Sequence, residues 1–375
     1  MNVHLVGCET SAVLEVSAAD VEQWKGSWIL SRSSDDRRTL IGQAYAYWRL
    51  RGFPFQVTSP EEAVSQLQSL RRSISARNAD QLLDSMDTSG LRLANSYHPQ
   101  MWSIRGYGRK RSPIEYFEDD QFLARMLERA PRFWPNRSCW NAQCVRSLFR
   151  IAAPGRVANF RPMVAAGVIR KFCPPGGQII DFCSGYGGRL LAAIACGARY
   201  IGIDASAEQI AGSQRMTADL QKGTDDAVSL VQGSATEMLT RIEPRSADLV
   251  FTSPPYFDKE RYGDGALQSY LQFPSYGDWL PGFLRAAVLQ SFGLLRTGGF
   301  LVLNVADTRR FPLATDTRAI MNEVFGNIAV YEMRMRRLPS YGHFGSSHRV
   351  EQILVSVKQS SARRQSAKGR RGSTR

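Results

Sequence analysis

The chain has 375 residues, of which 43% are hydrophobic and 22% charged, and this balance predicts a folded protein with one large domain or two smaller ones. No apolar run approaches the ~18 residues that span a membrane, and the start lacks the features of a signal peptide, so we expect a cytoplasmic protein without membrane contact. The six cysteines form no CxxC pair and are too few for a disulfide scaffold, and no metal site is predicted.

Charge gives the first indication of a partner. The 48 basic residues exceed the 34 acidic ones, and the resulting formal charge of +14 favours contact with a polyanion such as nucleic acid. Part of the excess lies in a tail at residues 360–375, which we expect to be disordered and either to aid solubility or to grip phosphates without sequence preference. Its basic residues are Arg363, Arg364, Lys368, Arg370, Arg371 and Arg375.

The first 155 residues have mostly helical patterns. These patterns cover residues 19–30, 40–51, 60–76 and 116–129, and polar loops separate them. We therefore predict a mostly helical substrate or partner domain at residues 1–155.

One segment of this region, residues 97–111, mixes aromatic and basic side chains. The mixture suits phosphate contact together with base stacking, and it equally suits a solvated loop that a few aromatic residues anchor. The aromatic residues are Tyr97, Trp102 and Tyr107, and the basic residues are Arg105, Arg109, Lys110 and Arg111.

From residue 156 to residue 359, apolar β-like runs alternate with helical patterns. This alternation predicts an α/β domain with a doubly wound, mostly parallel sheet. Two late β patterns, at residues 331–335 and 352–357, predict an antiparallel hairpin at the edge of that sheet. The other expected strands are residues 178–182, 200–203, 228–231, 249–252 and 300–304, and the expected helices include residues 189–195 and 207–220.

A glycine-rich segment follows the first expected strand. The strand reaches Asp181, and Gly185, Gly187 and Gly188 come before the next helix. Glycines there let the chain turn sharply and let a ligand approach bare backbone at the carboxyl end of a parallel strand. The cluster alone fits a nucleotide cofactor, a dinucleotide or a plain strand-to-helix turn.

Two downstream features point to the same expected site. Asp204 ends the second strand, where a carboxylate can accept both hydroxyls of a ribose, in a dinucleotide enzyme as well as in one that binds S-adenosylmethionine (SAM). After the third strand, Ser234 and the backbone near Ala235 are placed to read an adenine edge. An ordinary helix cap by Ser234 or Thr236 explains the same residues.

The fourth strand runs into Ser253, Pro254, Pro255 and Tyr256, which we predict to be a catalytic loop. The two prolines fix φ and remove two N–H donors, so their carbonyl groups form a rigid array of acceptors, to which the Ser253 hydroxyl adds another. Such an array suits an amino group on a flat ring, because it holds the N–H bonds while Tyr256 stacks on the ring. The alternative is a proline-stiffened loop without chemistry.

These segments resemble the amino-methylating DNA methyltransferases, which act on the exocyclic amine of cytosine or adenine. Residues 181–188 are similar to their first motif, although Cys183 stands where that family often has other residues. Residues 253–256 are similar to their catalytic motif, in the serine form that is more frequent among cytosine enzymes. Residues 159–171 are similar to the segment that closes over the methionine part of SAM.

The resemblance covers residues 157–358 and implies a Rossmann-like methyltransferase fold with SAM as cofactor. Arg161 is placed to pair with the SAM carboxylate, and a surface arginine near a domain junction is an equal alternative. The expected cofactor site comprises Phe160, Arg161, Asp181, Cys183, Gly185, Gly187, Gly188, Asp204, Ser234 and Ala235.

The leading hypothesis is a SAM-dependent methyltransferase acting on an exocyclic amino nitrogen of a nucleic-acid base, with DNA cytosine preferred. Related Pro-Pro-Tyr loops also serve enzymes that methylate RNA bases or a glutamine amide, and no target-recognition domain is recognisable. One alternative is an N-methyltransferase for a small amino-heterocycle or a peptide. A non-catalytic nucleic-acid-binding module is the other, and the intact motifs argue against it. The sequence does not predict an oligomeric state.

Overall fold

The chain forms two compact units in a computed structural model. The helical unit comprises residues up to 55 together with residues 113–153, and the sheet unit comprises residues 56–112 and the chain from residue 154 onward. The basic tail from residue 361, and Tyr107, Arg109 and Lys110, lie outside the described residues. The residues described are 18–105, 111–153, 157–221, 227–257, 262, 265–336 and 348–360.

The division differs from the expected boundary after residue 155, because residues 56–112 pack with the sheet. Leu67, Leu82 and Leu93 of this segment are buried in the same hydrophobic cluster as Ile179 and Val302 of the sheet. A hydrophobic helix joins whichever core buries it, and local periodicity does not specify which core that is.

The helical unit is built around aromatic residues. Trp140 is fully buried, its indole nitrogen donates to the Leu127 carbonyl at 2.9 Å, and its own carbonyl accepts from the Trp48 indole at 3.1 Å. The helix expected at 19–30 is broken at Lys25, whose extended backbone bridges Ser138. The helices of this unit are α1 (Ala18–Gln23), α2 (Gly26–Leu30), α3 (Ser34–Arg51), α7 (Pro113–Glu118), α8 (Asp120–Phe133) and α9 (Ala142–Ala152).

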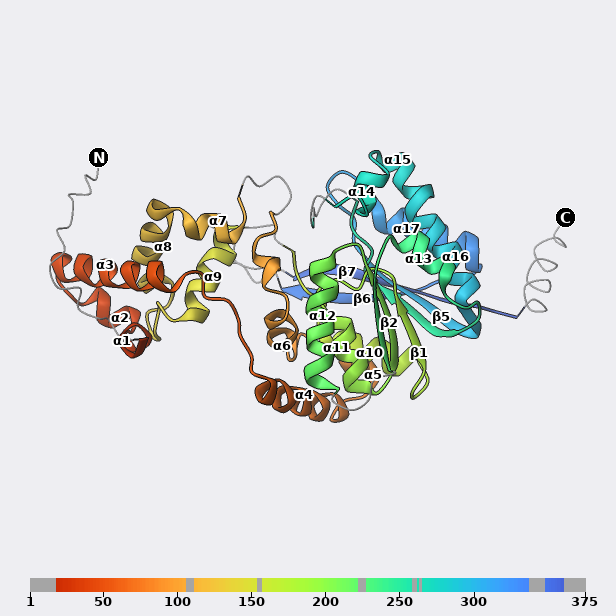
Figure 1. Cartoon of the computed structure of the whole chain (residues 1–375), viewed down its shortest axis with the longest axis horizontal. Coiled ribbons are helices and arrows are strands. Elements are labelled where there is room, and N and C mark those ends of the chain that lie inside the picture. The colour runs from red at the N-terminus through yellow and green to blue at the C-terminus, as the bar shows by residue number, and fades with distance from the viewer. Residues whose placement is uncertain are drawn as a thin grey trace. The chain divides into compact units, whose positions relative to one another are not determined.

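The sheet unit contains a seven-stranded sheet in the order β3-β2-β1-β4-β5-β7-β6 (Figure 1). Neighbouring strands from β3 to β5 are parallel, whereas β7 is antiparallel to both of its neighbours. The doubly wound, mostly parallel fold and its late antiparallel hairpin are therefore confirmed. The strands are β1 (Gln178–Asp181), β2 (Arg199–Asp204), β3 (Val228–Gln232), β4 (Ala247–Thr252), β5 (Leu295–Val305), β6 (Ala329–Arg336) and β7 (His348–Val357).

Helices cover both faces of this sheet. Successive strand residues point to opposite sides, so apolar residues on both faces need a layer of helices to bury them. Ile179 joins one hydrophobic cluster and Ile180 joins the other. Helices of the first cluster are α4 (Pro60–Ser75), α5 (Ala79–Leu83), α6 (Leu91–Ser96), α10 (Pro162–Phe172), α11 (Gly188–Cys196) and α12 (Ala207–Leu220). Those of the second include α13 (Ala235–Met238), α14 (Ser269–Gln272), α15 (Tyr276–Trp279), α16 (Ala286–Leu294) and α17 (Leu313–Phe325). Short turns at Pro99–Trp102 and Leu239–Arg241, and the π-helical turn Leu280–Arg285, complete the unit.

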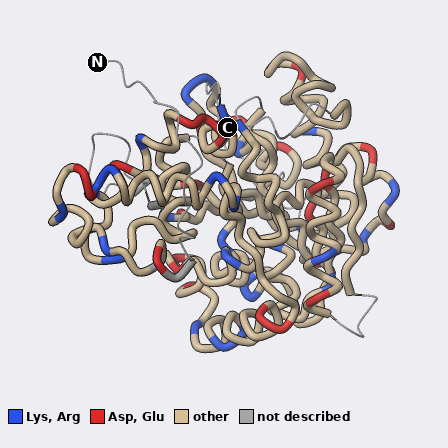
Figure 2. Tube along the Cα trace, turned by 60° about the vertical axis from the view of Figure 1, so that its left-hand side comes forward, with Lys and Arg blue, Asp and Glu red and all other residues tan. Residues whose placement is uncertain are grey.

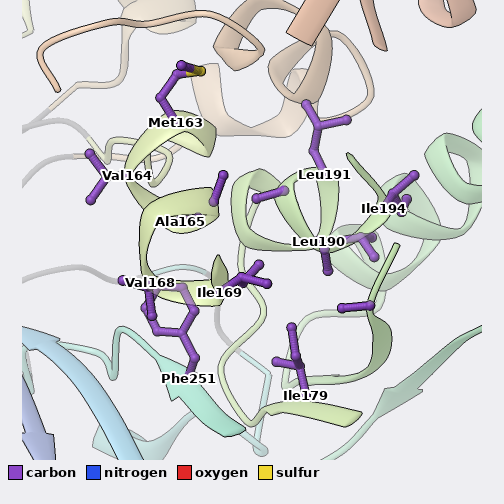
Figure 3. Packing of buried hydrophobic residues seen from close by; sticks show 14 of the residues in the cluster. Met163, Val164, Ala165, Val168, Ile169, Ile179, Leu190, Leu191, Ile194 and Phe251 are labelled. Atoms are coloured by element: carbon purple, nitrogen blue, oxygen red, sulfur yellow. The ribbon is translucent and has the colours of Figure 1, made fainter. Parts of the chain in front are cut away.

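Helices α10 and α11 anchor the segments on either side of the first strand (Figure 3). Val164, Val168 and Ile169 of α10 are buried, as are Leu190 and Leu191 of α11. The backbone of α5 also approaches α10 closely. A Cβ added to Gly167 of α10 would lie 2.7 Å from the backbone nitrogen of Leu83 in α5. None of the described helices is long and apolar enough to cross a membrane.

Candidate active site

A cavity of about 430 Å³ lies within the sheet unit, where strands β1, β2 and β4 end. The reversal of strand order between β1 and β4 leaves a crevice at their carboxyl ends, which is where open α/β sheets bind ligands. All four predicted catalytic residues, Ser253 to Tyr256, line this cavity. The predicted cofactor residues among its lining are Phe160, Arg161, Cys183, Gly185, Asp204 and Ala235, whereas Asp181, Gly187, Gly188 and Ser234 are not part of it.

Asp204 links the glycine-rich loop to the end of β2. Its Oδ2 accepts from the Gly185 nitrogen at 2.8 Å, and its Oδ1 accepts from the Ser206 nitrogen at 3.0 Å. Gly185 has a φ of 59°, and a Cβ added to it would meet nothing closer than the Cys183 carbonyl oxygen at 3.8 Å. The loop therefore leaves open space beside a carboxylate, as a ligand with a ribose requires.

We expect the SAM affinity of the protein to fall below about pH 6. Burial raises the pKa of Asp204 to about 6, although the Ser206 and Gly185 N–H groups act in the opposite direction. A ribose hydroxyl donates to the carboxylate and binds its deprotonated form more tightly, so acidification through pH 6 should weaken binding by up to about tenfold per pH unit. Calorimetry across this range measures the effect.

Asp204→Asn is the matched variant for this titration. It should bind SAM more weakly at neutral pH, by roughly 1.5–3 kcal/mol, and it should lose the change near pH 6. A wild-type affinity that does not vary with pH would exclude Asp204 from the cofactor contact.

Gly187 and Gly188 serve packing rather than the cavity. A Cβ on Gly188 would lie 2.1 Å from the Phe160 carbonyl oxygen, and one on Gly187 would lie 2.8 Å from the Met216 methyl carbon. The side chain of Asn159, which is not among the expected cofactor residues, fixes the same loop: its oxygen accepts from the Gly188 nitrogen at 3.1 Å and its nitrogen donates to the Tyr186 carbonyl at 2.7 Å. Gly188 thus allows the start of α11 to lie against residues 159–160, and Gly187 allows it to approach Met216 of α12.

Asp181 lies beneath the loop in a buried ion pair. Its Oδ2 is 2.6 Å from Arg189 Nε and accepts from the Tyr200 hydroxyl at 2.6 Å. Arg189 also donates to the Cys183 carbonyl. Burial lowers the pKa of Arg189, but the charge and hydrogen bond of Asp181 outweigh this effect and raise it. The signal for Arg189 in the sequence is a single charged residue in the otherwise apolar segment 188–196.

Arg161 is buried and bound to backbone carbonyls. Its guanidinium donates to Ser85 at 2.8 Å and to Arg334 at 2.6 Å, so it joins the segment 56–112 to β6. Arg161 is therefore not a surface arginine, which was the alternative to a contact with the SAM carboxylate. A bidentate contact with a cofactor carboxylate would require these carbonyl contacts to be exchanged.

The remaining predicted residues divide between the cavity and its surroundings. Ala235 lines the cavity, whereas the Ser234 hydroxyl donates to Gln272 Oε1 at 3.2 Å and makes no capping contact with α13. Tyr97 and Trp102 are buried, and the Tyr97 hydroxyl donates to Asp219 at 2.8 Å. These two aromatic side chains act as anchors of their segment.

The catalytic loop meets two side chains from other strands. Ser253 Oγ donates to the Asn304 carbonyl at 3.1 Å, and Asn304 Nδ2 donates to Glu351 Oε2 at 3.1 Å. The Tyr256 hydroxyl lies 3.4 Å from the same Glu351 oxygen. Asn304 and Glu351 both line the cavity; Asn304 is the last residue of an expected strand and Glu351 immediately precedes another, and neither was predicted as a site residue.

The chain turns sharply after Tyr256. Phe257 has a φ of 57°, a conformation that is rare for a residue with a side chain, and its ring packs against Tyr276, Trp279 and Phe311. Strain of this kind persists only where the surroundings determine the backbone, and it is concentrated at functional sites. The aromatic cluster thus fixes the exit from the catalytic loop.

Comparisons with known proteins match part of this chain. The model of a family described as RNA cap guanine-N2 methyltransferase matches residues 176–263, which include the glycine-rich loop, Asp204 and Ser253 to Tyr256. The Type II methyltransferase M.BglI of Bacillus subtilis is 36% identical over 84 residues, which is 22% of this chain and 22% of that protein. The match therefore spans about a fifth of this relative.

Solved structures resemble the chain at low identity. A SAM-dependent O-methyltransferase from Thermotoga maritima is 14% identical with a TM-score of 0.38, and the alignment covers 56% of this chain and 70% of that one. A SAM-dependent methyltransferase from Agrobacterium tumefaciens is 18% identical with a TM-score of 0.38, covering 56% and 65%. Likenesses at this level carry no argument about substrate.

The sheet and the cavity at its carboxyl edge form a Rossmann-like methyltransferase fold, and the partial sequence matches are to proteins described as methyltransferases. The cofactor of such a fold is SAM. The residues of the cavity fit this cofactor, because the Asp204 carboxylate can accept hydrogen bonds from ribose hydroxyls and Gly185 leaves room beside it.

Proposed function

We propose that the protein transfers a methyl group from SAM to an exocyclic amino nitrogen of a nucleic-acid base. The observation that carries this proposal is the position of Ser253 to Tyr256, which line the same cavity as Gly185 and Asp204. SAM supplies a methyl group on a positively charged sulfur. No strong base is needed before attack, because the amine becomes acidic only as the methyl group arrives.

The residues of the loop hold the amine and its ring. Pro254 and Pro255 have no N–H, so their backbone offers only acceptors to the amine hydrogens. The Ser253 hydroxyl is itself held by Asn304, which limits it to a supporting role. Tyr256 provides a ring on which a flat base stacks, and orientation of this kind contributes much of the rate enhancement in a two-substrate reaction.

Two bases are candidates for the substrate. The serine form of the catalytic motif favours cytosine in DNA, whereas the partial family match is described by guanine-N2 methylation in RNA. In a duplex, either base must be flipped out at a cost of a few kcal/mol. The helical unit and the basic tail are the proposed contacts with the nucleic-acid backbone. Among the described residues, Lys and Arg are interspersed with Asp and Glu along the trace (Figure 2).

The direct test is transfer of a labelled methyl group. The pure protein is incubated with labelled SAM and, separately, with DNA, RNA or a mixture of cell metabolites, and the labelled fraction is identified. Label in DNA or RNA on an amino nitrogen supports the proposal. Label only in a small amino-heterocycle or peptide would establish the alternative activity instead.

Salt dependence distinguishes the two substrate classes independently. We expect binding to nucleic acid to weaken roughly a thousandfold between about 50 and 200 mM salt if about six phosphates are contacted. A neutral small ligand should bind almost equally at both concentrations. Truncation after residue 360 removes six basic side chains and should reduce the salt dependence. A full-length protein with a flat salt profile would contradict the polyanion contact.

A further inference from the structure

The carboxyl groups of the cavity are divided between its two halves. Among the described lining residues, the acidic ones are Asp204 and Glu351. Asp204 lies at the end of β2 beside the glycine-rich loop, whereas Glu351 lies near the start of β7 beside Tyr256. The half of the cavity that contains the catalytic loop therefore has a carboxyl group of its own.

Glu351 engages donors that surround the catalytic loop. Its Oε2 accepts from Asn304 Nδ2 at 3.1 Å and from the Tyr256 hydroxyl at 3.4 Å. Pro254 and Pro255 contribute no N–H, and the Ser253 hydroxyl donates to the Asn304 carbonyl. This end of the cavity is thus rich in acceptors, and the donors of Asn304 and Tyr256 are directed at Glu351.

We propose that Glu351 is a specificity-determining residue that selects a base whose amino group adjoins a ring N–H. The inference rests on the proposed function, and guanine is the base that meets the requirement, since its N2 amine lies beside N1–H. A carboxylate only accepts, and it binds a pair of adjacent donors with charge-assisted hydrogen bonds. Neutral cytosine and adenine place a ring nitrogen lone pair beside the amine, and the carboxylate repels that lone pair.

The size of the discrimination depends on the neighbours of Glu351. Glu351 itself is half-buried, but Asn304 is 2% exposed and Tyr256 is 6% exposed, so on that side water does not readily replace a lost contact. A site built to hydrogen-bond a substrate N–H rejects analogues that lack it far more strongly than an apolar pocket rejects a missing methyl group. Guanine should therefore be methylated in clear preference to cytosine and adenine.

The test uses polymerase-made DNA and transcribed RNA of mixed sequence, both free of modified bases. Each is incubated with the full chain and SAM and digested to nucleosides, and the methylated nucleosides are identified by mass spectrometry. N2-methylated guanine is the expected product, in whichever polymer is the substrate. Wild-type protein that forms only N4-methylcytosine or N6-methyladenine would overturn the inference and leave the proposed function intact. No methylated nucleoside in either polymer would overturn both.

Variants of Glu351 separate selectivity from folding. Glu351→Gln keeps the size of the side chain but replaces one acceptor with a donor, so kcat/KM for guanine should fall about 10- to 100-fold, with the ratio of guanine to cytosine methylation falling as well. SAM affinity should not change. Glu351→Asp keeps the charge and should retain the guanine preference. The matched control is Glu332→Gln, the same change at an exposed position on β6.

A purely structural role predicts a different pattern. In that case Glu351→Gln would lower the thermal midpoint and the SAM affinity together, and the ratio between bases would stay constant. This pattern, or equal activity of Glu351→Gln and wild type on guanine, would overturn the assignment.

Discussion

Replacing Tyr256 with alanine is expected to slow methyl transfer by one to two orders of magnitude or more while SAM affinity is retained. Tyr256 follows β4 and lies beside Glu351 of β7, whereas Asp204 ends β2 on the other side of β1, so we expect the loss of the ring to act on the substrate and not on the cofactor. Base stacking on an aromatic side chain is worth about 1–3 kcal/mol, and each 1.36 kcal/mol of barrier corresponds to about tenfold in rate. Single-turnover transfer of labelled methyl, together with calorimetry of SAM binding, measures both quantities.

Two further variants serve as controls for Tyr256. Tyr256→Phe keeps the ring and removes only the contact between the hydroxyl and Glu351, so most of the activity should remain. Ser253→Ala should have a smaller effect than Tyr256→Ala, because the proline carbonyl groups remain. Full methyl transfer by Tyr256→Ala on its true substrate would remove this loop from the catalytic site. A joint loss of stability and SAM affinity would assign Tyr256 to loop packing.

Replacing Arg189 with methionine is expected to lower the free energy of unfolding by about 3–5 kcal/mol. The side chains of Arg189 and Asp181 are 6% and 0% exposed, and removal of the cation leaves the Asp181 carboxylate buried without its charge partner. The same change frees the Cys183 carbonyl, so the glycine-rich loop should also lose SAM affinity. Chemical denaturation of the SAM-free protein measures the stability term.

The control for this prediction is Arg199→Met, because Arg199 is exposed at the start of β2. That variant should unfold within about 0.5 kcal/mol of the wild type. Combining Asp181→Asn with Arg189→Met removes both charges and should recover part of the lost stability. An Arg189→Met protein as stable as the Arg199→Met control would contradict the importance of the buried pair.

The sequence by itself determined the strands and indicated which residues line one side of the cavity. Apolar runs followed by glycines or prolines marked the ends of β1 and β4, and burial in a parallel sheet imposes such runs locally. Ser253 to Tyr256 and Asp204 line one cavity because the carboxyl ends of parallel strands meet at one edge of the sheet. Residues within a few positions of a strand end are therefore placed by local pattern alone.

The tertiary structure alone decided which helices share a core. The segment 56–112 has ordinary amphipathic helices, and only their packing against α10 and α11 assigns it to the sheet unit. The same limit applies to Arg161, whose partners at Ser85 and Arg334 lie 76 and 173 residues away in the chain. The periodicity of a sequence indicates that a residue is buried, but it does not indicate which residues pack against it.

Tertiary structure also decided which side chains complete the catalytic loop. Asn304 and Glu351 lie 51 and 95 residues beyond Ser253 and Tyr256, at or beside expected strands that carried no other functional signal. They reach the loop because β5 pairs with β4 on one side and with the antiparallel β7 on the other. Strand order and register depend on how the whole sheet is buried. The position of a side chain that depends on strand order therefore cannot be predicted from its neighbours in the sequence.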